Sequence, residues 1–207
     1  MLRIALATED ELSEAVGLRL VAEVAPALEV GLRLRRGGYG YLRSRITNFC
    51  QMAQREPVLL ITDLDNHDCA ASLIEDWMRR TPRATGLMFR VAVREIESWL
   101  LADHDAVKAL FGRNAMKLPD LPDILADPKR AFLSLARSAR REVRADLCAQ
   151  TGAIAAQGLG YNRRLTDFVR RDWNPMRASS RSDSLRRARH RLRELANDVM
   201  RGSGRGF

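Results

Sequence analysis

The stretch Val58-Leu-Leu-Ile-Thr-Asp-Leu-Asp65 decides the fold, because it is a short apolar run that ends in two aspartates one residue apart. An apolar run of this length predicts a strand that is buried on both faces of a parallel sheet. Residues i and i+2 of an extended segment point to the same side, so Asp63 and Asp65 would present their carboxylates together. Such an oxygen-rich pair suits Mg²⁺ or Mn²⁺. The plainer alternative is that the two acids start a loop and cap the next helix.

Three other segments read as strands, and helical patterns separate them. Leu28 to Arg35 alternates strictly between apolar and polar residues, which predicts a strand with one wet face near an edge of the sheet. Strands that alternate with helices indicate an α/β fold with a doubly wound, mainly parallel sheet. The other expected strands are Leu2 to Ala7 and Leu87 to Val93, and the expected helices are Leu12 to Val24, Tyr41 to Gln54 and Ala71 to Arg80.

Acidic residues follow three of these strands. Glu9 follows the first strand, Asp63 and Asp65 end the third, and Glu95 and Glu97 follow the fourth. Ligand sites of open parallel sheets lie at the carboxyl ends of the strands, so these acids are expected at one rim. Clustered carboxylates repel one another, and such a group makes sense chiefly around divalent cations.

The charge of the chain is divided unevenly along its length. The chain has 207 residues and a net charge of +9; residues 1–103 hold 13 arginines and no lysine against 15 acids, whereas residues 104–207 hold 22 basic residues against 11 acids. An acidic half beside a basic half suggests a metal site next to a surface that meets a polyanion. We expect an α/β core in residues 1–103, a helical basic extension packed on it in residues 104–200, and a frayed tail in residues 201–207.

The basic extension supplies the candidate phosphate contacts. Ser182 could cap a last helix in which an apolar stripe alternates with arginines, and Lys129 is one of only three lysines in the chain. These cations could equally form an ordinary solvated face. The candidates for nucleic-acid binding are Lys129, Arg186, Arg187, Arg189 and Arg193.

Several other classes of site are disfavoured by what the sequence lacks. A receiver domain or a haloacid-dehalogenase phosphatase needs a core lysine, and a P-loop needs Gly-Lys-Ser/Thr. An EF-hand loop would need glycine where this chain has Asp68. The three cysteines show no zinc-type spacing. No segment resembles a signal peptide or a membrane span, so we expect a soluble cytoplasmic protein with no membrane association.

The order of the acids resembles a known family. Glu9 after the first strand, Asp63-x-Asp65 after the third and a core of about a hundred residues look like the Toprim domain of topoisomerases, primases and OLD-type nucleases. The segment Ala92 to Asp103, with Glu97-Ser-Trp-Leu-Leu101, is similar to a bacterial Toprim-like family of uncharacterised proteins. That family is related to RloB-like proteins and is often encoded beside ATPases in anti-phage loci. Asp127-Pro-Lys129, Gly160-Tyr-Asn162, Trp173 and Ser182 to Leu185 also fit its pattern.

The resemblance implies a fold, roles and partners. It implies a Toprim-like, Rossmann-like sheet, with Asp63 and Asp65 as the metal-binding pair and Glu97 as a further carboxylate ligand. Glu9 would act as a general acid or base or bind metal, although many relatives have Glu-Gly where this chain has Glu9-Asp10. The implied activity is metal-dependent cleavage of phosphodiester bonds in DNA or RNA, with one or two Mg²⁺ or Mn²⁺ ions, in an anti-phage system with an ATPase partner.

Two other functions stay open on the sequence. A non-catalytic subunit could use the acidic rim to dock a partner or a regulatory metal while its basic half holds nucleic acid. A nucleotide phosphohydrolase would release small products from nucleotides without cutting polymers. The sequence does not choose between DNA and RNA, between one metal and two, between Glu95 and Glu97, or between oligomeric states.

Overall fold

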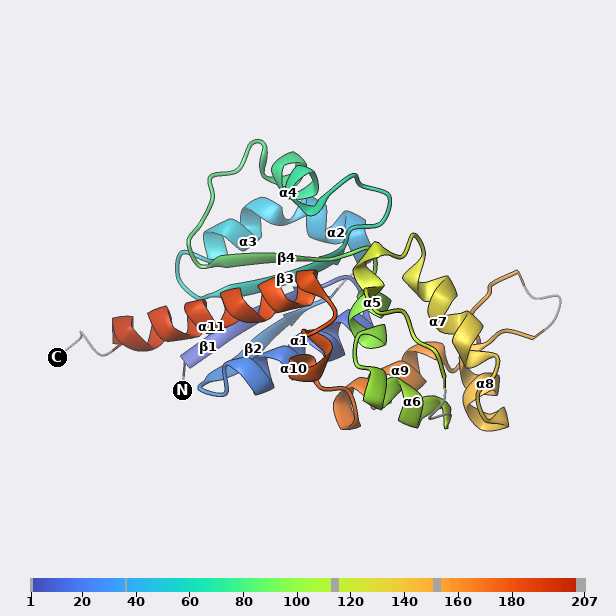
Figure 1. Cartoon of the computed structure of the whole chain (residues 1–207). Coiled ribbons are helices and arrows are strands. Elements are labelled where there is room, and N and C mark those ends of the chain that lie inside the picture. The colour runs from blue at the N-terminus through green and yellow to red at the C-terminus, as the bar shows by residue number, and fades with distance from the viewer. Residues whose placement is uncertain (1, 36, 113–115, 151–153, 204–207) are drawn as a thin grey trace.

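A four-stranded, all-parallel sheet forms the centre of the protein in the computed structural model, which describes residues 2–35, 37–112, 116–150 and 154–203 (Figure 1). The strand order is β2-β1-β3-β4. This arrangement confirms the predicted α/β fold with its parallel sheet. The strands are β1 (Leu2–Thr8), β2 (Leu28–Leu34), β3 (Val58–Asp63) and β4 (Leu87–Ala92).

The burial of β3 and most of β2 follows from their sequence patterns. Val58 to Ile61 of β3 are at most 1% exposed, as expected for an apolar run between two neighbouring strands. β2 is an edge strand, and its alternation accounts for the exposed Glu29 and Arg33, whereas Leu32, on the apolar side of the pattern, is 47% exposed. The register pairs Thr8 of β1 with Ile61 of β3. It also pairs Asp63 with Ala92 of β4, so three strands end at nearly the same level.

Helices cover both faces of the sheet. One face packs on α2 (Gly38–Ser44), α3 (Ile46–Met52) and α4 (Ala70–Met78), and the other on α1 (Glu11–Val24) and α11 (Asp183–Ser203). Helix α9 (Tyr161–Arg171) packs against α1 rather than against the sheet. The single helix predicted from Tyr41 to Gln54 is wrong. The structure has two short helices that meet at Arg45, and the turn between them keeps Leu42, Ile46 and Phe49 against the sheet.

The remaining helices gather beyond the carboxyl ends of the strands, at the right of Figure 1. One hydrophobic cluster runs from β1 and α1 into this region and includes Leu6, Trp99, Phe132 and Trp173, each at most 1% exposed. The residues on either side of Asp103 therefore share a core. The elements beyond the strand ends are α5 (Ile96–Leu101), α6 (His104–Phe111), η1 (Pro122–Ile124), α7 (Pro128–Ala136) and α8 (Arg141–Leu147). The short helix α10 (Pro175–Ala178) contacts α1, α5 and α11.

The last helix begins where the sequence predicts. Ser182 Oγ accepts a hydrogen bond of 3.2 Å from the backbone N–H of Leu185, which is the expected N-cap interaction. Leu185, Ala188 and Leu192 form its buried stripe. The helix runs to Ser203, and residues 204–207 lie outside the described part of the chain. Within the described residues, no helix is both long and apolar enough to cross a bilayer.

Candidate functional site

Glu9 lies directly after β1 and is held by the end of β3. Its Oε1 accepts hydrogen bonds from the hydroxyl of Thr62 and, at 3.0 Å, from the backbone N–H of Asp63. Burial raises the pKa of Glu9, and these two hydrogen bonds oppose the rise. Asp10 takes a different role, because its side chain caps α1 by accepting from the N–H of Ser13 at 2.8 Å. Glu9 is therefore the residue that the fold directs toward β3.

Asp63 is the most strongly perturbed acid of the site. The residue as a whole is partly exposed, but its Oδ1 atom is buried and has no hydrogen-bond partner among the described residues. Burial raises its pKa well above the usual value, and the neighbouring carboxylates of Glu97 and Glu9 raise it further. An unpaired buried oxygen of this kind costs free energy unless a ligand or a proton satisfies it.

Asp65 sits on an exposed loop that Arg94 holds in place. Its φ of 48° lies in the left-handed region, which aspartate adopts more readily than most residues. The backbone N–H of Asp65 donates to the Arg94 carbonyl at 3.0 Å. The Arg94 guanidinium in turn donates to the carbonyls of Asp65 at 3.1 Å and His67 at 2.9 Å. Sequence reasoning missed Arg94, although its place between β4 and Glu95 was a signal.

Glu97 is buried at the start of α5, and Tyr161 of α9 reaches it. Glu97 is 4% exposed, and its Oε1 accepts a hydrogen bond of 2.7 Å from the Tyr161 hydroxyl. Burial raises the pKa of Glu97, and the hydrogen bond from Tyr161 opposes that rise. Tyr161 belongs to the Gly160-Tyr-Asn162 motif, so the sequence signalled the segment but not the contact.

Glu95 has a partner of its own at the start of α7. Its Oε2 accepts a hydrogen bond of 2.9 Å from the backbone N–H of Lys129, in the first turn of that helix. Burial raises the pKa of Glu95, and the hydrogen bond from Lys129 opposes it. The side chain of Lys129 continues over the ring of Tyr161, with Nζ 5.1 Å from the ring centroid. Glu95 and Glu97 are thus bound to different helices of the basic half.

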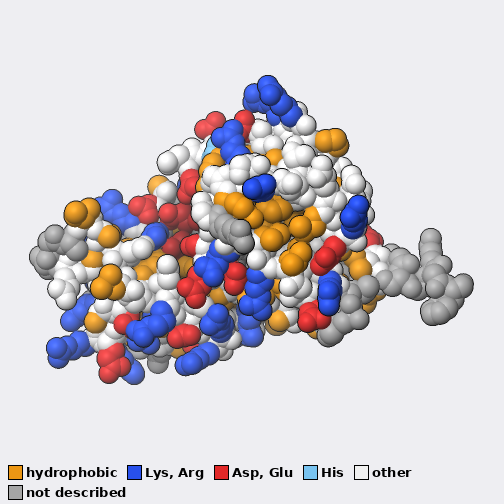
Figure 2. Space-filling view, turned by 180° about the vertical axis from the view of Figure 1, so that it is seen from behind, with side chains coloured by type: hydrophobic (Ala, Val, Ile, Leu, Met, Phe, Trp, Pro, Cys, Tyr) orange, Lys and Arg blue, Asp and Glu red, His pale blue; other side chains and the backbone are white. Residues whose placement is uncertain are grey.

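These contacts bring the predicted acids of three strand ends into one electrostatic group. Neighbouring carboxylates raise the pKa values of Glu9, Asp63, Glu95 and Glu97 in addition to the effect of burial, and the charge of Lys129 opposes the rise at Glu95 and Glu97. Figure 2 shows acidic side chains gathered between the α/β part and the smaller lobe formed by α7 and α8. The group consists of Glu9, Asp10, Asp63, Asp65, Glu95 and Glu97.

The donor set of this group suits a hard cation such as Mg²⁺, because it consists of carboxylate oxygens. Within the ranges that the structure describes, however, no three His, Cys, Asp or Glu side chains lie close enough together to hold an ion as they stand. Protein donors occupy one oxygen each of Glu9, Glu95 and Glu97. Oδ1 of Asp63 is buried and lacks a hydrogen-bond partner among the described residues. The chemistry fits a divalent ion, and the carboxylates would have to draw together around it.

An aromatic chain lies beside Asp65 on the other side of the site. Trp77 Nε1 donates to the hydroxyl of Tyr39 at 3.1 Å, and that hydroxyl is 3.0 Å from Nε2 of His67. Tyr39, Asp65 and His67 line a hollow of about 290 Å³. The sequence showed His67 next to the aspartate pair, but Tyr39 and Trp77 are too distant along the chain to have been connected with it.

The arginines predicted for nucleic-acid binding are distributed along α11, which packs beside β4 and extends away from α5 (Figure 1). Arg186 and Arg187 pair with Asp183 on the same helix. Arg189 is 9% exposed and donates to both Glu23 and Ser179, which gives it a structural role. Arg193 is exposed. Of the predicted cations, the structure brings Lys129 to the acidic group.

No protein-family model, no curated protein and no solved structure matches this chain. The assignment of a function therefore depends on the residues of the site themselves.

Proposed function

We propose that this protein is a metal-dependent nuclease that hydrolyses phosphodiester bonds of DNA or RNA. The observation that carries the proposal is the buried, unpartnered Oδ1 of Asp63 among the carboxylates at the ends of β1, β3 and β4. A carboxylate in this position costs free energy in the folded protein, and a bound cation would offset that cost. The order of the acids along the chain, which resembles Toprim-like nucleases, supports the same reading.

Each acid has a distinct role in this proposal. Asp63, Asp65 and Glu97 would hold one or two Mg²⁺ or Mn²⁺ ions. When bound, such an ion lowers the pKa of water and stabilises the negative charge that develops on a phosphodiester. Glu9 is fixed through Oε1, and its raised pKa suits the uptake of a proton at its other oxygen. Tyr161 and Arg94 position Glu97 and Asp65, respectively.

The anti-phage setting and the ATPase partner rest on the resemblance alone, and both stay predictions. The choice between DNA and RNA depends on the cleavage experiment.

Cleavage by the purified chain tests the proposal. Supercoiled plasmid and a fluorescently labelled single-stranded RNA would be incubated with the protein in Mg²⁺, in Mn²⁺ and in EDTA. We expect cleavage with a divalent ion and none in EDTA. Asp63→Asn keeps the size of the side chain and should reduce cleavage by about two orders of magnitude or more, because it removes the central anionic ligand.

The matched control is Asp198→Asn, which makes the same change at an exposed position of α11. It should leave cleavage at the wild-type rate. Cleavage that survives in both Asp63→Asn and Glu97→Gln, at the rate of the control, would rule the proposed site out.

One observation favours a non-catalytic binding subunit instead. Oxygens of Glu9, Glu95 and Glu97 already have protein partners, as they would in a purely structural acidic cluster. In that case the protein would bind nucleic acid with equal affinity in Mg²⁺ and in EDTA, would not cut it, and Asp63→Asn would not change the binding. Electrophoretic mobility shifts run beside the cleavage assay would reveal this pattern.

A further inference from the structure

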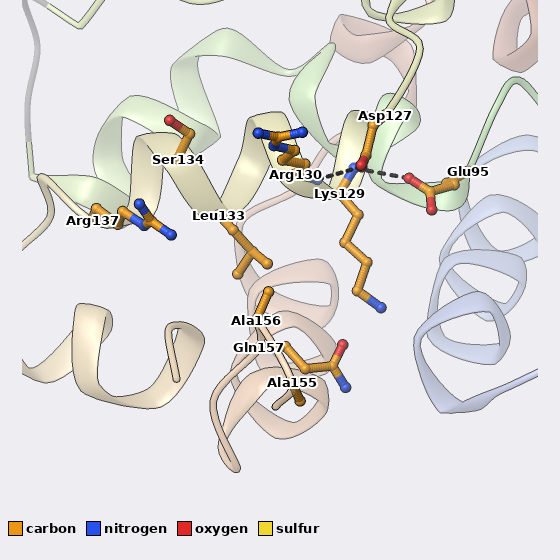
Figure 3. A pocket seen from close by; sticks show the side chains of 10 residues that line it. All are labelled: Glu95, Asp127, Lys129, Arg130, Leu133, Ser134, Arg137, Ala155, Ala156 and Gln157. Carbon is orange, nitrogen blue, oxygen red and sulfur yellow. Dashed lines mark hydrogen bonds between the residues drawn. The ribbon is translucent and has the colours of Figure 1, made fainter. Parts of the chain in front are cut away.

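A cleft of about 510 Å³ opens beside the acidic group, between α7 and the segment 155–157 (Figure 3). Glu95 stands at its border and connects it to the carboxylates, because Glu95 interacts electrostatically with both Asp65 and Glu97. From there the cleft continues along α7, past Lys129 to Arg137. Its position means that a ligand in the cleft would have one end at the proposed reaction centre.

Three cations line the cleft, and unlike Arg186, Arg187 and Arg189 of α11 they form no ion pair at close range with any described residue. In the part of the chain that the structure describes, Lys129, Arg130 and Arg137 form no salt bridge, although Lys129 rests against the ring of Tyr161. Arg130 and Arg137 are exposed. Cations without partners around a concave surface attract an anion.

The two acids that line the cleft are engaged by the start of α7. Glu95 Oε2 accepts from the N–H of Lys129 at 2.9 Å, and Asp127 Oδ1 accepts from the N–H of Arg130 at 2.7 Å. The partial positive charge of a helix N-terminus offsets such carboxylates. The charges of Arg130 and Arg137 are therefore available for a ligand, whereas the charge of Lys129 also acts on Glu95 and Glu97.

The floor of the cleft is apolar and its wall carries neutral polar groups. Leu133 points toward Ala156, and the side chain of Lys129 points toward Gln157 (Figure 3). Leu133 is 5% exposed, so only its edge faces the cleft, and the exposed Ala155 and Ala156 supply more of the apolar surface. The amide of Gln157 and the hydroxyl of Ser134 can both donate and accept hydrogen bonds. An apolar surface with a few polar groups suits a sugar and base, whereas the cations suit a phosphate.

We propose that this cleft binds one nucleotide of a single nucleic-acid strand, next to the phosphodiester that the carboxylates act on. The phosphates on either side of the nucleoside would contact Lys129 and Arg137, and the sugar and base would lie against Leu133 and Ala156. The volume suits a ligand of this size and is too small for a double helix. This assignment rests on the proposed function, and it makes a single strand or a strand end the substrate.

Binding in EDTA separates the cleft from the chemistry. Three probes would be titrated into isotope-labelled protein without divalent ions: a thymidine oligomer of about four nucleotides, thymidine monophosphate and inorganic phosphate. We expect the oligomer to bind most tightly and to shift the amide resonances of α7. Equal affinity for the oligomer and the mononucleotide would overturn the strand assignment in favour of a free nucleotide. Equal affinity for thymidine monophosphate and inorganic phosphate would mean that the sugar and base do not contact the apolar floor, and would overturn that part of the proposal.

Charge-removing variants locate the site. Lys129→Gln and Arg137→Gln should each weaken binding of the oligomer by about tenfold, as expected for the loss of one charge-assisted hydrogen bond to phosphate. Arg55→Gln makes the same change at an exposed position in the turn before β3 and should leave the affinity at its wild-type value. Weakening by Arg193→Gln, without weakening by Lys129→Gln or Arg137→Gln, would place the strand on α11 and overturn the proposal.

A further variant avoids any argument from lost side-chain packing. Ala156→Glu adds a carboxylate at an exposed position. It should reduce the affinity for the oligomer more than the affinity for thymidine, which is a neutral nucleoside. Circular dichroism would verify that each variant is folded.

Failure of the cleft and failure of the nuclease proposal give different results. Oligomer binding that depends on Lys129 and Arg137, without cleavage in any divalent ion, would support the cleft and reject the nuclease. Cleavage with a KM unchanged by Lys129→Gln and Arg137→Gln would support the nuclease and overturn the cleft.

Discussion

The hydroxyl of Tyr161 donates a hydrogen bond of 2.7 Å to Oε1 of Glu97, and both side chains are buried. The bond joins α9 of the basic half to the first turn of α5, immediately after β4. It supplies a neutral donor to a carboxylate that burial would otherwise leave costly to ionise. Tyr161 therefore favours the anionic form of Glu97 and opposes the rise in its pKa that burial causes.

Tyr161→Phe removes only this donor. In EDTA we expect the free energy of unfolding to fall by about 1–3 kcal/mol, the cost of leaving a buried acceptor unsatisfied. In saturating Mg²⁺ the loss should be smaller, because the cation provides the missing partner. Urea unfolding under both conditions measures the difference, with Tyr41→Phe in α2 as the matched change. An equal loss of unfolding free energy in EDTA and in Mg²⁺ would mean that Glu97 does not bind the metal.

The acids of the site predict how stability depends on pH. Burial and mutual repulsion raise the folded-state pKa values of Asp63, Glu9 and Glu97 above their ordinary values of 3.8 and 4.5. A raised pKa means that the folded state binds the proton more tightly than the unfolded state does. The stability contributed by protonation is complete below the ordinary values and is lost as the pH rises through the folded-state values.

We therefore expect the melting temperature of the metal-free protein to decrease as the pH rises from about 4 toward neutrality, to the extent that these acids dominate. Asp63→Asn carries no charge and should flatten this decrease, so that the variant is more stable than the wild type in EDTA at pH 7. Mg²⁺ should stabilise the wild type and have little effect on the variant. Thermal unfolding across the pH range measures all three effects. If the wild type is more stable than Asp63→Asn in EDTA at pH 7, the buried charge of Asp63 does not destabilise the metal-free protein, and the prediction is wrong.

The placement of the acids shows which parts of the site were predictable. The strands and their order along the chain followed from periodicity, because β3 is apolar from Val58 to Ile61 and β2 alternates. Parallel strands end at one edge, so Glu9, Asp63 and Glu97 could be expected near one another. The break at Arg45 could not be expected, because helical spacing continues across it and only packing against the sheet divides it.

Sequence periodicity could not predict the contacts between residues that are far apart along the chain. Tyr161 and Glu97 are separated by 64 residues, and Arg189 and Glu23 by 166. An arginine that forms a buried ion pair and one that faces solvent look alike in the sequence of a helix. The acidic rim was predictable because it depends on strand ends, whereas the choice of cations depends on tertiary pairing.

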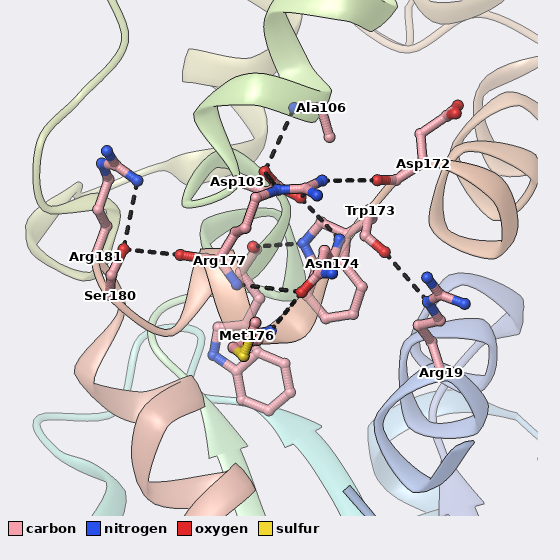
Figure 4. Close-up of polar contacts among 11 residues, drawn as sticks. Arg19, Asp103, Ala106, Asp172, Trp173, Asn174, Met176, Arg177, Ser180 and Arg181 are labelled. Carbon is pink, nitrogen blue, oxygen red and sulfur yellow. Dashed lines mark hydrogen bonds and ion pairs between the residues drawn. The ribbon is translucent and has the colours of Figure 1, made fainter. Parts of the chain in front are cut away.

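The carboxylate of Asp103 provides a test of how the two halves are joined. It is buried and accepts from Arg177 Nε at 2.9 Å and Nη2 at 2.8 Å, and from the N–H of Asn174 at 2.7 Å (Figure 4). Arg177→Met would leave this charge without its main partner and should cost stability at the lower end of about 3–5 kcal/mol, since the guanidinium is partly exposed. Asp103→Asn combined with Arg177→Met should recover part of that loss, because no buried charge remains. Urea unfolding of the single and double variants measures the coupling, and simple additivity would contradict the pairing.

His67 and His104 each have a hydrogen-bond partner at Nε2, and their neutral rings should carry the proton on opposite nitrogens. Nε2 of His104 lies 3.0 Å from the carbonyl of Pro119, which can only accept, so its neutral ring should be protonated at Nε2. Nε2 of His67 lies 3.0 Å from the Tyr39 hydroxyl, which already accepts from Trp77 and has its own proton to donate. The neutral ring of His67 should therefore accept at Nε2 and carry its proton on Nδ1, as a donor beside Asp65. Nitrogen-15 chemical shifts distinguish the two tautomers, with His104 as the internal control. In Tyr39→Phe, part of the His67 population should become protonated at Nε2. If His67 of the wild type is already protonated at Nε2, the hydrogen bond runs from His67 to Tyr39 and this prediction is wrong.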